Sequence, residues 1–294
     1  MRVQFHVLLE WAQKQRALRA GLIWARDAVR FLVFRSSYFR GAYESFREAE
    51  AAASPATRIG YNYGDLARKY QADLELNLDN FEYPVLYHLG RILTEHCTVL
   101  DIGGNIGTHF LRYRKYLNLE TVRWIVCDLP EITKVGQEAC AGMPSVEFIN
   151  DIDEVARSRV DVLLASDSLQ YIESHDALLR RLIARGLGPR HLLIDQLPLY
   201  DGRRFVTLQN GGPVQYPQYV FNRADYLTFI AHLGYDLLDA WHCRNFACIV
   251  PFHPDKTVRP YTGLYFRERS LKERCLAADA VSSVPRAMAK EAAA

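Results

Sequence analysis

A glycine-rich segment stands where a strand-like apolar run gives way to a helical pattern. It reads Asp101-Ile102-Gly103-Gly104-Asn105-Ile106-Gly107 and follows the run that begins at Thr98. Glycines at such a turn let a bound nucleotide cofactor approach the backbone, and the N-terminus of the following helix faces that cofactor. The dinucleotide pattern G-x-G-x-x-G fails, because Asn105 and Thr108 stand where it requires glycine. A tight strand-to-helix turn with no ligand would also fit these glycines.

An aspartate ends the second predicted strand, where the ribose of a nucleoside would lie. Asp128 follows the apolar run 122–127 and comes 21 residues after Gly107. A carboxylate there can accept the hydrogens of both ribose hydroxyls, which suits a nucleoside without a 2′-phosphate. The same side chain could cap the helix that begins at Leu129-Pro130, and both roles can hold together.

The loop after the third predicted strand offers two polar side chains. Asn150 and Asp151 follow the apolar run 146–149. In a nucleotide-binding sheet this loop lies beside the adenine, whose amino group can donate to an oxygen of the loop. Asp151 could equally cap the helix that begins near Ile152, so two interpretations stay open.

Short apolar runs alternate with helical patterns from Thr98 onward, which is typical of βαβ units in a parallel sheet. The runs are apolar on both faces, as in strands covered by helices on each side. A helix predicted over 222–232 follows, and two last strands pair as a hairpin across residues 243–245. We therefore expect an α/β fold with a seven-stranded Rossmann-like methyltransferase sheet, five strands parallel plus the terminal antiparallel hairpin, and an N-terminal helical extension. The predicted strands are 98–102, 122–127, 146–149, 160–165, 191–194, 234–241 and 246–251.

Four parts are expected along the chain. Residues 1–60 form an N-terminal helical arm, and residues 61–95 form a helical lead-in to the core with a break near Pro84. Residues 96–255 form the Rossmann-like domain. Residues 256–294 form a C-terminal tail that is partly disordered, since its Ala- and Arg-rich end lacks a core pattern.

Charge is distributed unevenly between the arm and the rest. Residues 2–40 carry eight Lys or Arg against two acidic residues, a net charge of +6, whereas the whole chain carries +2, which leaves −4 for the remainder. An acidic core is a poor nucleic-acid surface, because such surfaces need basic side chains to neutralise phosphates. Residues 1–35 alternate apolar and basic side chains. They predict a helix packed on the domain or on a second subunit, or else a basic amphipathic helix on an anionic membrane.

The cellular compartment is inferred from cysteines and apolar runs. The chain has six cysteines and no C-x-x-C pair, and several cysteines lie within apolar runs, which indicates buried free thiols. The chain shows no secretory signal and no apolar run near the ~20 residues of a spanning helix. We expect a cytoplasmic protein, with peripheral contact to the inner face of the membrane through residues 1–35 and homo-oligomerisation as open alternatives.

Five segments taken in order resemble one protein family. They are similar to the bacterial methyltransferases found among polysaccharide and O-antigen biosynthesis genes, over roughly residues 38–252. The resemblance implies that S-adenosyl-L-methionine is the cofactor and that a glycan hydroxyl accepts the methyl group. The chain departs from the family pattern at Asp167, where a small residue is usual, and at Gln196, where arginine is usual. The five segments are Tyr38–Tyr43, Val99–Gly107, Ser168–Tyr171, Ile194–Pro198 and Gln215–Pro217.

The expected cofactor site combines the glycine loop with the ends of the next strands. The carboxyl ends of parallel strands meet at one edge of a sheet, so these residues should lie close together. The end of the fourth strand should lie beside the reactive sulfonium. The candidate cofactor-binding residues are Asp101, Gly103, Gly104, Asn105, Gly107, Asp128, Leu129, Asn150, Asp151, Ser166, Leu169 and Gln170.

Methyl transfer from a sulfonium to a hydroxyl is an in-line displacement in which a base removes the hydroxyl proton. Asp195, at the end of the fifth strand, is the first candidate base, although a structural carboxylate would fit that position too. His109 has a more suitable intrinsic pKa but could face the adenosine instead. Asp167 could be a base or, with Asp195, a ligand of a divalent metal. Two carboxylates without a third ligand do not define a metal site, so no metal is predicted.

An aromatic and amide-rich segment, residues 201–219, follows the fifth strand and is expected to be a substrate loop. Flat aromatic faces and amide groups suit pyranose rings and their hydroxyls. The tyrosines could instead anchor the loop. The candidate acceptor-binding residues are Tyr171, Gln215, Tyr216 and Tyr219.

The sequence therefore predicts an S-adenosylmethionine-dependent methyltransferase that O-methylates a sugar of a cell-surface glycan or of its precursor. The alternative is a non-catalytic S-adenosylmethionine-binding scaffold or regulatory partner in a biosynthetic complex, since the sequence does not single out one base and the arm is long. A nicotinamide-dependent oxidoreductase is disfavoured by the missing dinucleotide pattern.

Overall fold

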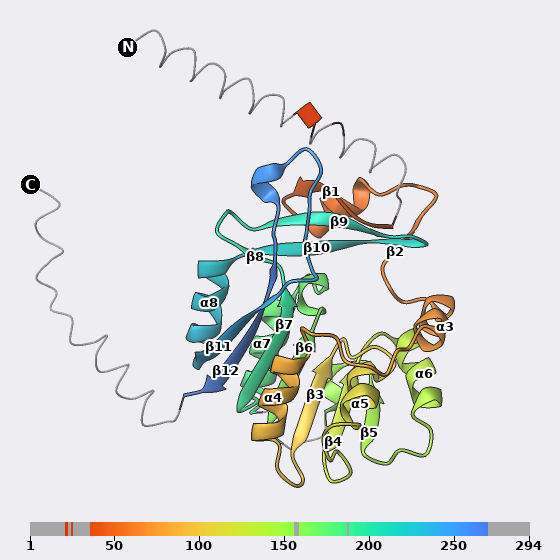
Figure 1. The fold of residues 1–294 in the computed structure, drawn as a ribbon, viewed down its shortest axis with the longest axis vertical. Helices are drawn as coiled ribbons and strands as arrows, with labels where there is room; N and C mark the ends of the chain where they lie inside the picture. Colours follow the sequence, from red (N-terminus) through yellow and green to blue (C-terminus); the bar gives the residue numbers. More distant parts are fainter. Residues whose placement is uncertain (1–20, 23–24, 26–35, 156–158, 187, 270–294) are drawn as a thin grey trace, which may run out of the picture.

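The computed structural model describes residues 21–22, 25, 36–155, 159–186 and 188–269, which form a seven-stranded main sheet and a smaller second sheet (Figure 1). The helices predicted for residues 1–35 fall almost entirely outside this described part, as does the chain after residue 269. Within the described part, no helix has both the length and the apolar character that a membrane span requires.

The main sheet has the strand order β11-β12-β7-β6-β3-β4-β5. Strands β3 to β7 run parallel, while β12 runs antiparallel to its two neighbours, β7 and β11. The predicted sheet of five parallel strands plus an antiparallel hairpin is confirmed. Its strands are β3 (Thr98–Ile102), β4 (Arg123–Cys127), β5 (Val146–Ile149), β6 (Val162–Ser166), β7 (His191–Leu197), β11 (Tyr235–Cys243) and β12 (Tyr261–Glu268).

Helices cover both faces of the main sheet. Alternate side chains of each strand point to opposite faces and pack against the helices on that side. Leu100, Leu163 and Ile194 pack on the face covered by α7 and α8. Val99 and Trp124 pack on the face covered by α4 and α5. Both faces are therefore apolar, as the sequence predicts. The helices are α4 (Tyr83–Ile92), α5 (Thr108–Tyr113), α6 (Pro130–Ala139), α7 (His175–Ala184) and α8 (Arg223–His232).

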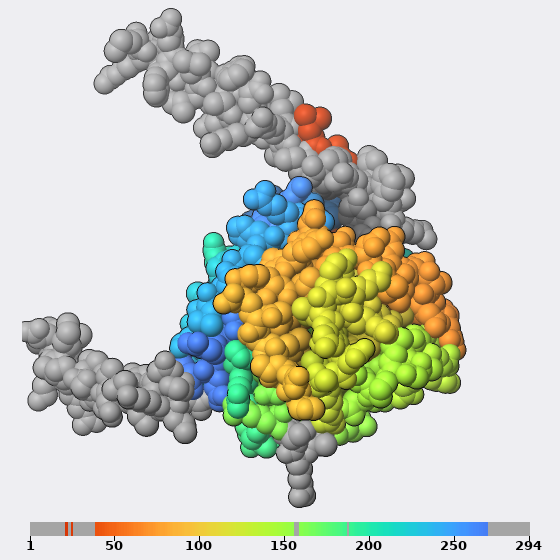
Figure 2. Space-filling view, turned by 60° about the horizontal axis from the view of Figure 1, so that its bottom comes forward, coloured from red at the N-terminus to blue at the C-terminus, as the bar shows by residue number. Residues whose placement is uncertain are grey.

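The lead-in segment contains α3 (Gly64–Ala72) and α4, so its predicted helical character is confirmed. Pro84 lies in the first turn of α4, where proline is favoured because its missing N–H would be unsatisfied there. Figure 2 shows the lead-in, in orange to gold, beside the yellow surface of α5. An ion pair of 2.9 Å between Glu82 and Arg112 joins the two segments.

A second sheet lies across the carboxyl end of the parallel strands, above the tip of β3 in Figure 1. In this sheet β9 pairs antiparallel with β1 and with β10, while β2 and β8 pair parallel to β10. A short helix, α2 (Phe46–Ala51), packs against β1, β9 and β10. The strands are β1 (Ser36–Tyr43), β2 (Arg58–Ile59), β8 (Leu199–Tyr200), β9 (Phe205–Gly211) and β10 (Val214–Asn222).

This second sheet corrects two predictions. The segment 201–219 is a β-hairpin rather than a loop, and residues 36–43 of the predicted helical arm form a strand. Gly212, with φ of +86°, provides the tight turn between β9 and β10. Pro217 lies inside β10, and a proline within an apolar run argues against a strand at the sequence level.

The partner strand of the terminal hairpin is also corrected. Residues 246–251 do not form a strand. They form an irregular segment in which Cys248 and Val250 are buried beside Val258 and Tyr261. The seventh strand is β12, which lies within the predicted tail 256–294, so the main sheet continues past residue 255. A short buried apolar run cannot be distinguished from a strand by its pattern alone.

Candidate active site

The glycine loop makes a tight turn between β3 and α5. Gly103 and Gly107 have φ of +70° and +87°, and Asn105 has φ of +57°. The Asn105 side chain accepts a hydrogen bond of 2.8 Å from the N–H of Ile106, which stabilises the left-handed conformation. A Cβ on Gly103 would lie 2.4 Å from the Cβ of Ser168, so only glycine lets the loop pack against the segment after β6.

Asp101 lies beneath this loop and has no exposed surface. Its carboxylate accepts hydrogen bonds from Trp124 Nε1 at 3.1 Å and from His109 Nδ1 at 3.0 Å. A Cβ on Gly104 would lie 2.4 Å from this carboxylate. Burial lowers the pKa of His109, but the charge and hydrogen bond of Asp101 raise it, and the net shift is upward. Asp101 therefore supports the loop and orients the His109 ring.

Asp128 joins the glycine loop to the end of β4. Its carboxylate accepts hydrogen bonds from the N–H groups of Asn105 at 2.8 Å and of Leu129 at 2.7 Å. The capping alternative is wrong, because the N-cap of α6 is Leu129. Burial raises the pKa of Asp128, the two backbone N–H groups offset this only in part, and the net value is about 6. A carboxylate has about four acceptor positions, so Asp128 keeps capacity for further donors.

Near Asp128 lie one apolar residue, Leu129, and two polar residues, Asn150 and Asp151. Leu129 is 41% exposed, so an apolar side chain lies at the surface beside Asp128. The Asn150 side chain donates to the carbonyl oxygen of Asp128 at 2.8 Å and to Thr133 Oγ1 at 2.7 Å. Asp151 caps a 3₁₀ turn, residues 152–154, with a complete capping box, so the capping interpretation of Asp151 is confirmed.

The segment after β6 brings several polar groups to the same edge of the sheet. Asp167 has φ of +51°, and its carboxylate accepts a hydrogen bond of 2.5 Å from Gln170 Nε2. Ser168 Oγ and Gln170 Oε1 are buried and have no hydrogen-bond partner among the described residues. Leu169 is 1% exposed in the main core, so its side chain is not available to a cofactor. Strained backbone and unsatisfied polar atoms cluster at functional sites.

The environment of Asp167 changes its acidity. Burial and, to a smaller extent, the charge of Asp195 raise the pKa of Asp167, the hydrogen bond from Gln170 lowers it, and the net value is about 7. A carboxyl group that titrates near neutral pH can accept and release a proton under physiological conditions. Asp167 therefore has the acid–base property that a catalytic base requires.

Asp195 lies deeper, at the end of β7, and is 1% exposed. Its carboxylate accepts hydrogen bonds from Trp241 Nε1 at 2.9 Å and Cys243 Sγ at 3.1 Å, both on β11. The next residue, Gln196, has φ of +57° and donates to Ser166 Oγ at 2.8 Å. These contacts connect β6, β7 and β11, so the geometry favours the structural role of Asp195 over that of a base.

Substituting Asp195 with alanine should destabilise the protein by about 1–3 kcal/mol, because the Trp241 indole and the Cys243 thiol would lose their buried acceptor. Urea unfolding followed by circular dichroism measures this free energy. Asp255→Asn, on an exposed turn, is the matched control and should be neutral. Unchanged stability in Asp195→Ala would contradict the structural role.

Tyrosines from three parts of the chain form a cluster above this edge. Tyr61 stacks on Tyr216 with ring centroids 4.0 Å apart, and Tyr171 contacts both rings edge-on at 5.4 Å. Tyr171 Oη donates to Gln209 Oε1 of β9 at 2.8 Å. Burial raises the pKa of Tyr61, Tyr171 and Tyr216, and the nearby charge of Asp167 raises each further. We call Tyr61, Tyr171 and Tyr216 the tyrosine cluster, and Asp167 lies beside it.

The second sheet adds a buried amide to the same region. Gln218 of β10 has no exposed surface and donates to Tyr261 Oη of β12 at 2.9 Å. Gln218 Oε1 and Thr262 Oγ1 are buried without a partner among the described residues. Burial raises the pKa of Tyr261, and the charge of Asp167 contributes to this shift, which places Tyr261 near that carboxylate. Unsatisfied acceptors thus occur on both sheets.

Two residues that were predicted to bind the methyl acceptor, Gln215 and Tyr219, make other contacts. The Gln215 side chain accepts a hydrogen bond of 3.0 Å from the N–H of Ser54 and so ties the chain before β2 to β10. Tyr219 packs against Phe46 at 4.7 Å and donates to the carbonyl oxygen of Glu173, within the main core. Tyr216 and Tyr219 lie an odd number of residues apart in one strand, so they point to opposite faces of the sheet. Tyr171 and Tyr216 do come together.

Three residues of this region are missed by the sequence analysis. Tyr61, Tyr70 and Tyr261 lie in segments that were expected to be a lead-in and a tail. Burial raises the pKa of Tyr70, and the charges of Asp128 and Asp167 add to the shift, so Tyr70 lies near both. The Gly212-Pro213 turn between two runs rich in aromatic and β-branched side chains is the signal that could have indicated the hairpin of β9 and β10.

The order and directions of the main-sheet strands define the α/β Rossmann-like methyltransferase fold, in which an antiparallel strand is inserted beside the last parallel one. No family model and no curated protein matches the chain.

Among solved structures, the chain is similar to 1,6-didemethyltoxoflavin-N1-methyltransferase from Burkholderia thailandensis with bound S-adenosylhomocysteine, at 17% identity and a TM-score of 0.45 over 71% of this chain and 84% of that one. It is similar to an S-adenosylmethionine-dependent methyltransferase from Aquifex aeolicus, at 18% identity and 0.47 over 70% and 99%. It is also similar to magnesium protoporphyrin IX methyltransferase from Synechocystis PCC 6803, at 13% identity and 0.47 over 71% and 96%.

Proposed function

We propose that this protein is an S-adenosyl-L-methionine-dependent methyltransferase that acts on a hydroxyl oxygen. The observation that carries the proposal is Asp128, a partly exposed carboxylate at the end of β4 that holds the glycine loop and keeps acceptor capacity. In this fold such a carboxylate is positioned to accept the hydrogens of both ribose hydroxyls.

The charge of the site supports a cationic donor rather than a dinucleotide. Asp101, Asp128, Asp167 and Asp195 all lie at the carboxyl ends of β3, β4, β6 and β7. Carboxylates attract the sulfonium and ammonium groups of S-adenosylmethionine and repel the pyrophosphate of a dinucleotide. The chain also lacks the glycine spacing that pyrophosphate binding requires.

The residues present fit the proposed cofactor. Gly103 and Gly104 let the loop backbone pack directly against Ser168 and Asp101, which fixes the turn that the cofactor would approach. Asp128 would accept the ribose hydroxyls, and the exposed Leu129 would cover a face of the adenine. Bound S-adenosylmethionine supplies a methyl group on a positively charged sulfur. Ser168 Oγ is a buried polar group without a described partner at this edge.

We also propose that the acceptor is a sugar, in a cell-surface glycan or its precursor. The tyrosine cluster offers aromatic faces, while Gln170 Oε1 and Gln218 Oε1 are buried acceptors without described partners. Hydroxyl hydrogens of a pyranose would satisfy such acceptors, and its C–H face would pack on a ring. The carboxylate of Asp167 disfavours an anionic group at the reacting position.

Asp167 is the base in this proposal. It takes the proton from the acceptor hydroxyl as the oxygen forms its bond to the methyl carbon, and the carbon–sulfur bond breaks with its electrons going to sulfur. Gln170 holds the carboxylate by a hydrogen bond of 2.5 Å, and its backbone neighbour Tyr171 belongs to the tyrosine cluster. The second sheet covers this edge, which limits the access of water.

Calorimetry with S-adenosylhomocysteine tests the cofactor assignment. We expect binding at pH 7.5 that full-length protein retains when NAD is present in excess. Absence of binding by protein with an intact fold would exclude the proposed function. Competition by NAD would favour a nicotinamide-dependent enzyme instead.

The affinity for S-adenosylhomocysteine should decrease in acid. The pKa of Asp128 is raised to about 6, so its carboxylate is charged above this pH and is protonated as the pH falls through it. The charged form accepts both ribose hydroxyls, and affinity should fall by up to about tenfold for each pH unit below 6. Calorimetric titrations between pH 5 and pH 8 measure this dependence. Asp128→Asn should bind weakly and lose the dependence, and a wild-type profile in that variant would place the ribose elsewhere.

A further inference from the structure

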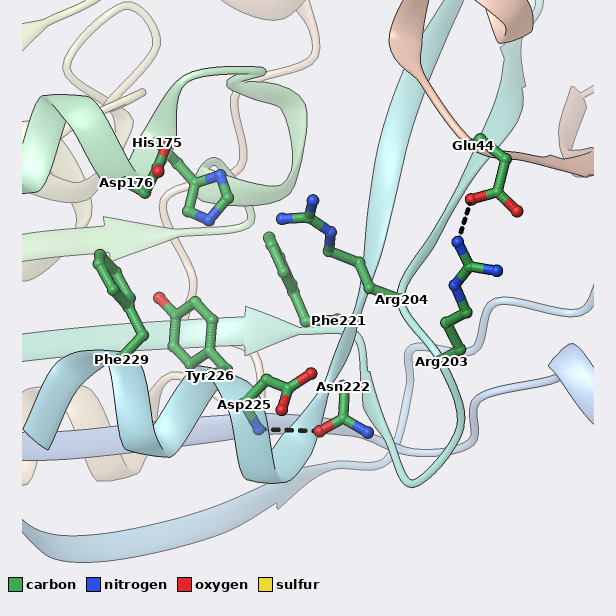
Figure 3. A pocket seen from close by; sticks show the side chains of 10 residues that line it. All are labelled: Glu44, His175, Asp176, Arg203, Arg204, Phe221, Asn222, Asp225, Tyr226 and Phe229. Carbon is green, nitrogen blue, oxygen red and sulfur yellow. Dashed lines mark hydrogen bonds and ion pairs between the residues drawn. The ribbon is translucent and has the colours of Figure 1, made fainter.

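A pocket of about 410 Å³ opens on the other side of β10 from the tyrosine cluster. It lies between the starts of α7 and α8, and residues 203–204, just before β9, line its third side (Figure 3). None of the residues predicted for the cofactor or the acceptor lines it. Its volume falls within the range of small-molecule sites, about 300–1,000 Å³.

The lining of this pocket has an unusual composition. Its ten lining residues include no aliphatic side chain, and each carries an aromatic ring, a carboxylate, a guanidinium or an amide. Carboxylates, guanidinium groups and amides are planar and can hold two neighbouring hydroxyls at once. Aromatic rings pack against the C–H faces of sugar rings. This combination suits a polyhydroxylated ring.

The charges of the pocket oppose an ionic ligand. The Arg203 guanidinium forms an ion pair of 2.8 Å with the Glu44 carboxylate. Arg204 has no ion pair among the described residues and lies over the Tyr219 ring at 4.9 Å. Asp176 and Asp225 also line the pocket and have no ion pair among the described residues. Acidic groups disfavour a phosphate, and Arg204 disfavours an ammonium group, so a neutral ligand fits best.

Two side chains that line the pocket, Tyr226 and His175, keep hydrogen-bonding capacity for a ligand. Tyr226 is 4% exposed, and its hydroxyl is buried with no hydrogen-bond partner among the described residues. His175 Nδ1 lies 3.3 Å from the carbonyl oxygen of Ile172, which can only accept, so Nδ1 carries the proton. Burial lowers the pKa of His175; the charge of Asp176 and the Ile172 carbonyl oppose this, Arg204 adds to it, and the net shift is downward, which leaves Nε2 as a neutral acceptor. Figure 3 shows Arg204 reaching toward this ring, with Phe221, Tyr226 and Phe229 alongside.

We infer that this pocket binds a neutral sugar residue. Its lining combines aromatic rings with the guanidinium of Arg204 and the carboxylates of Asp176 and Asp225, and the Tyr226 hydroxyl has no hydrogen-bond partner among the described residues. The sugar class follows from this lining alone, whereas its membership of the methylated glycan rests on the proposed function.

The pocket is connected to the tyrosine cluster by β10. Tyr216 lies in the cluster and Phe221 lines the pocket. Five residues of strand separate them, roughly 17 Å at about 3.3 Å per residue. These two residues are five apart in one strand and so point to opposite faces of β10, and a monosaccharide in the pocket does not touch the tyrosine cluster. An acceptor in contact with both would be an oligosaccharide that extends past the strand.

Ligand-observed saturation-transfer NMR on the full chain saturated with S-adenosylhomocysteine tests the pocket. The probes are maltotriose, mannotriose and N-acetylchitotriose, with inorganic phosphate as the ionic competitor. At least one trisaccharide should show saturation transfer that phosphate does not displace. Arg204→Ala and Asp225→Ala should weaken its binding at least tenfold. Both side chains are exposed, so the fold should persist, and the exposed Arg190→Ala is the matched control.

Three outcomes would overturn the inference: no transfer to any trisaccharide, equal transfer in wild type and both variants, or displacement by phosphate. Calorimetry on the same samples reports the cofactor separately. Trisaccharide binding without S-adenosylhomocysteine binding would leave the pocket assigned and refute the proposed function. The reverse result would retain the methyltransferase and remove the sugar pocket.

Discussion

Asp167→Asn should lower the rate of methyl transfer by about 10²- to 10⁴-fold, the usual contribution of a general base, while affinity for S-adenosylhomocysteine stays unchanged. Asparagine keeps the shape of the side chain and still accepts from Gln170, but it cannot take the acceptor proton. The wild-type rate should rise with pH and level off at or below about pH 7, because the pKa of Asp167 is about 7 and a nearby sulfonium would lower it.

Transfer can be followed with S-adenosylmethionine that carries a deuterated methyl group and with cell-envelope glycans as acceptors. Mass spectrometry of the released sugars then reports both rate and position. Asp255→Asn controls for the loss of a carboxylate at a distant exposed site. If His109→Gln loses the rate and Asp167→Asn keeps it, the base is His109, whose ring Asp101 orients. Transfer to any acceptor would exclude a purely scaffolding role, and a label found only on nitrogen would exclude the sugar.

Gly103→Val should abolish S-adenosylhomocysteine binding. The new Cβ would lie 2.4 Å from the Cβ of Ser168, and valine would also be forced into φ of +70°. The loop must shift away from the segment after β6, which displaces the backbone that the cofactor approaches. We expect binding below the calorimetric detection limit, with a loss of stability of about 1–3 kcal/mol from the strained backbone.

Gly142→Val separates these two effects. Gly142 also has a left-handed φ, +79°, but a Cβ there meets nothing within 4 Å. It should therefore lose stability like Gly103→Val and keep wild-type affinity. Wild-type affinity in Gly103→Val would show that the cofactor does not approach this loop.

The inner parallel strands of the main sheet could be predicted because they are buried on both faces. Such strands are continuous apolar runs, and β3 begins and ends at the predicted residues. The second sheet could not be predicted in the same way. Its strand β10 contains Pro217 and is rich in amides, and its strand β1 follows a basic amphipathic segment, so composition favoured a loop and a helix.

The candidate site, too, could be predicted only where it depends on local sequence. The loop from Gly103 to Gly107 and the position of Asp128 depend on a local strand-to-helix turn, which sequence spacing describes well. The environment of Asp195 depends on Trp241 and Cys243, contacts across almost 50 residues that no local pattern contains. Tyr216 meets Tyr61 only through the second sheet, so that part of the site follows from tertiary structure alone.

The position of β12 also affects how the protein folds while it is being synthesised. β12 is the last strand of the main sheet to leave the ribosome, yet it is inserted between β7 and β11 in the interior of that sheet. Until residue 268 has emerged, the backbone of β7 keeps an open edge that can pair with other nascent chains. Chaperone protection should matter most in this interval, when five parallel strands exist and their closing strand does not.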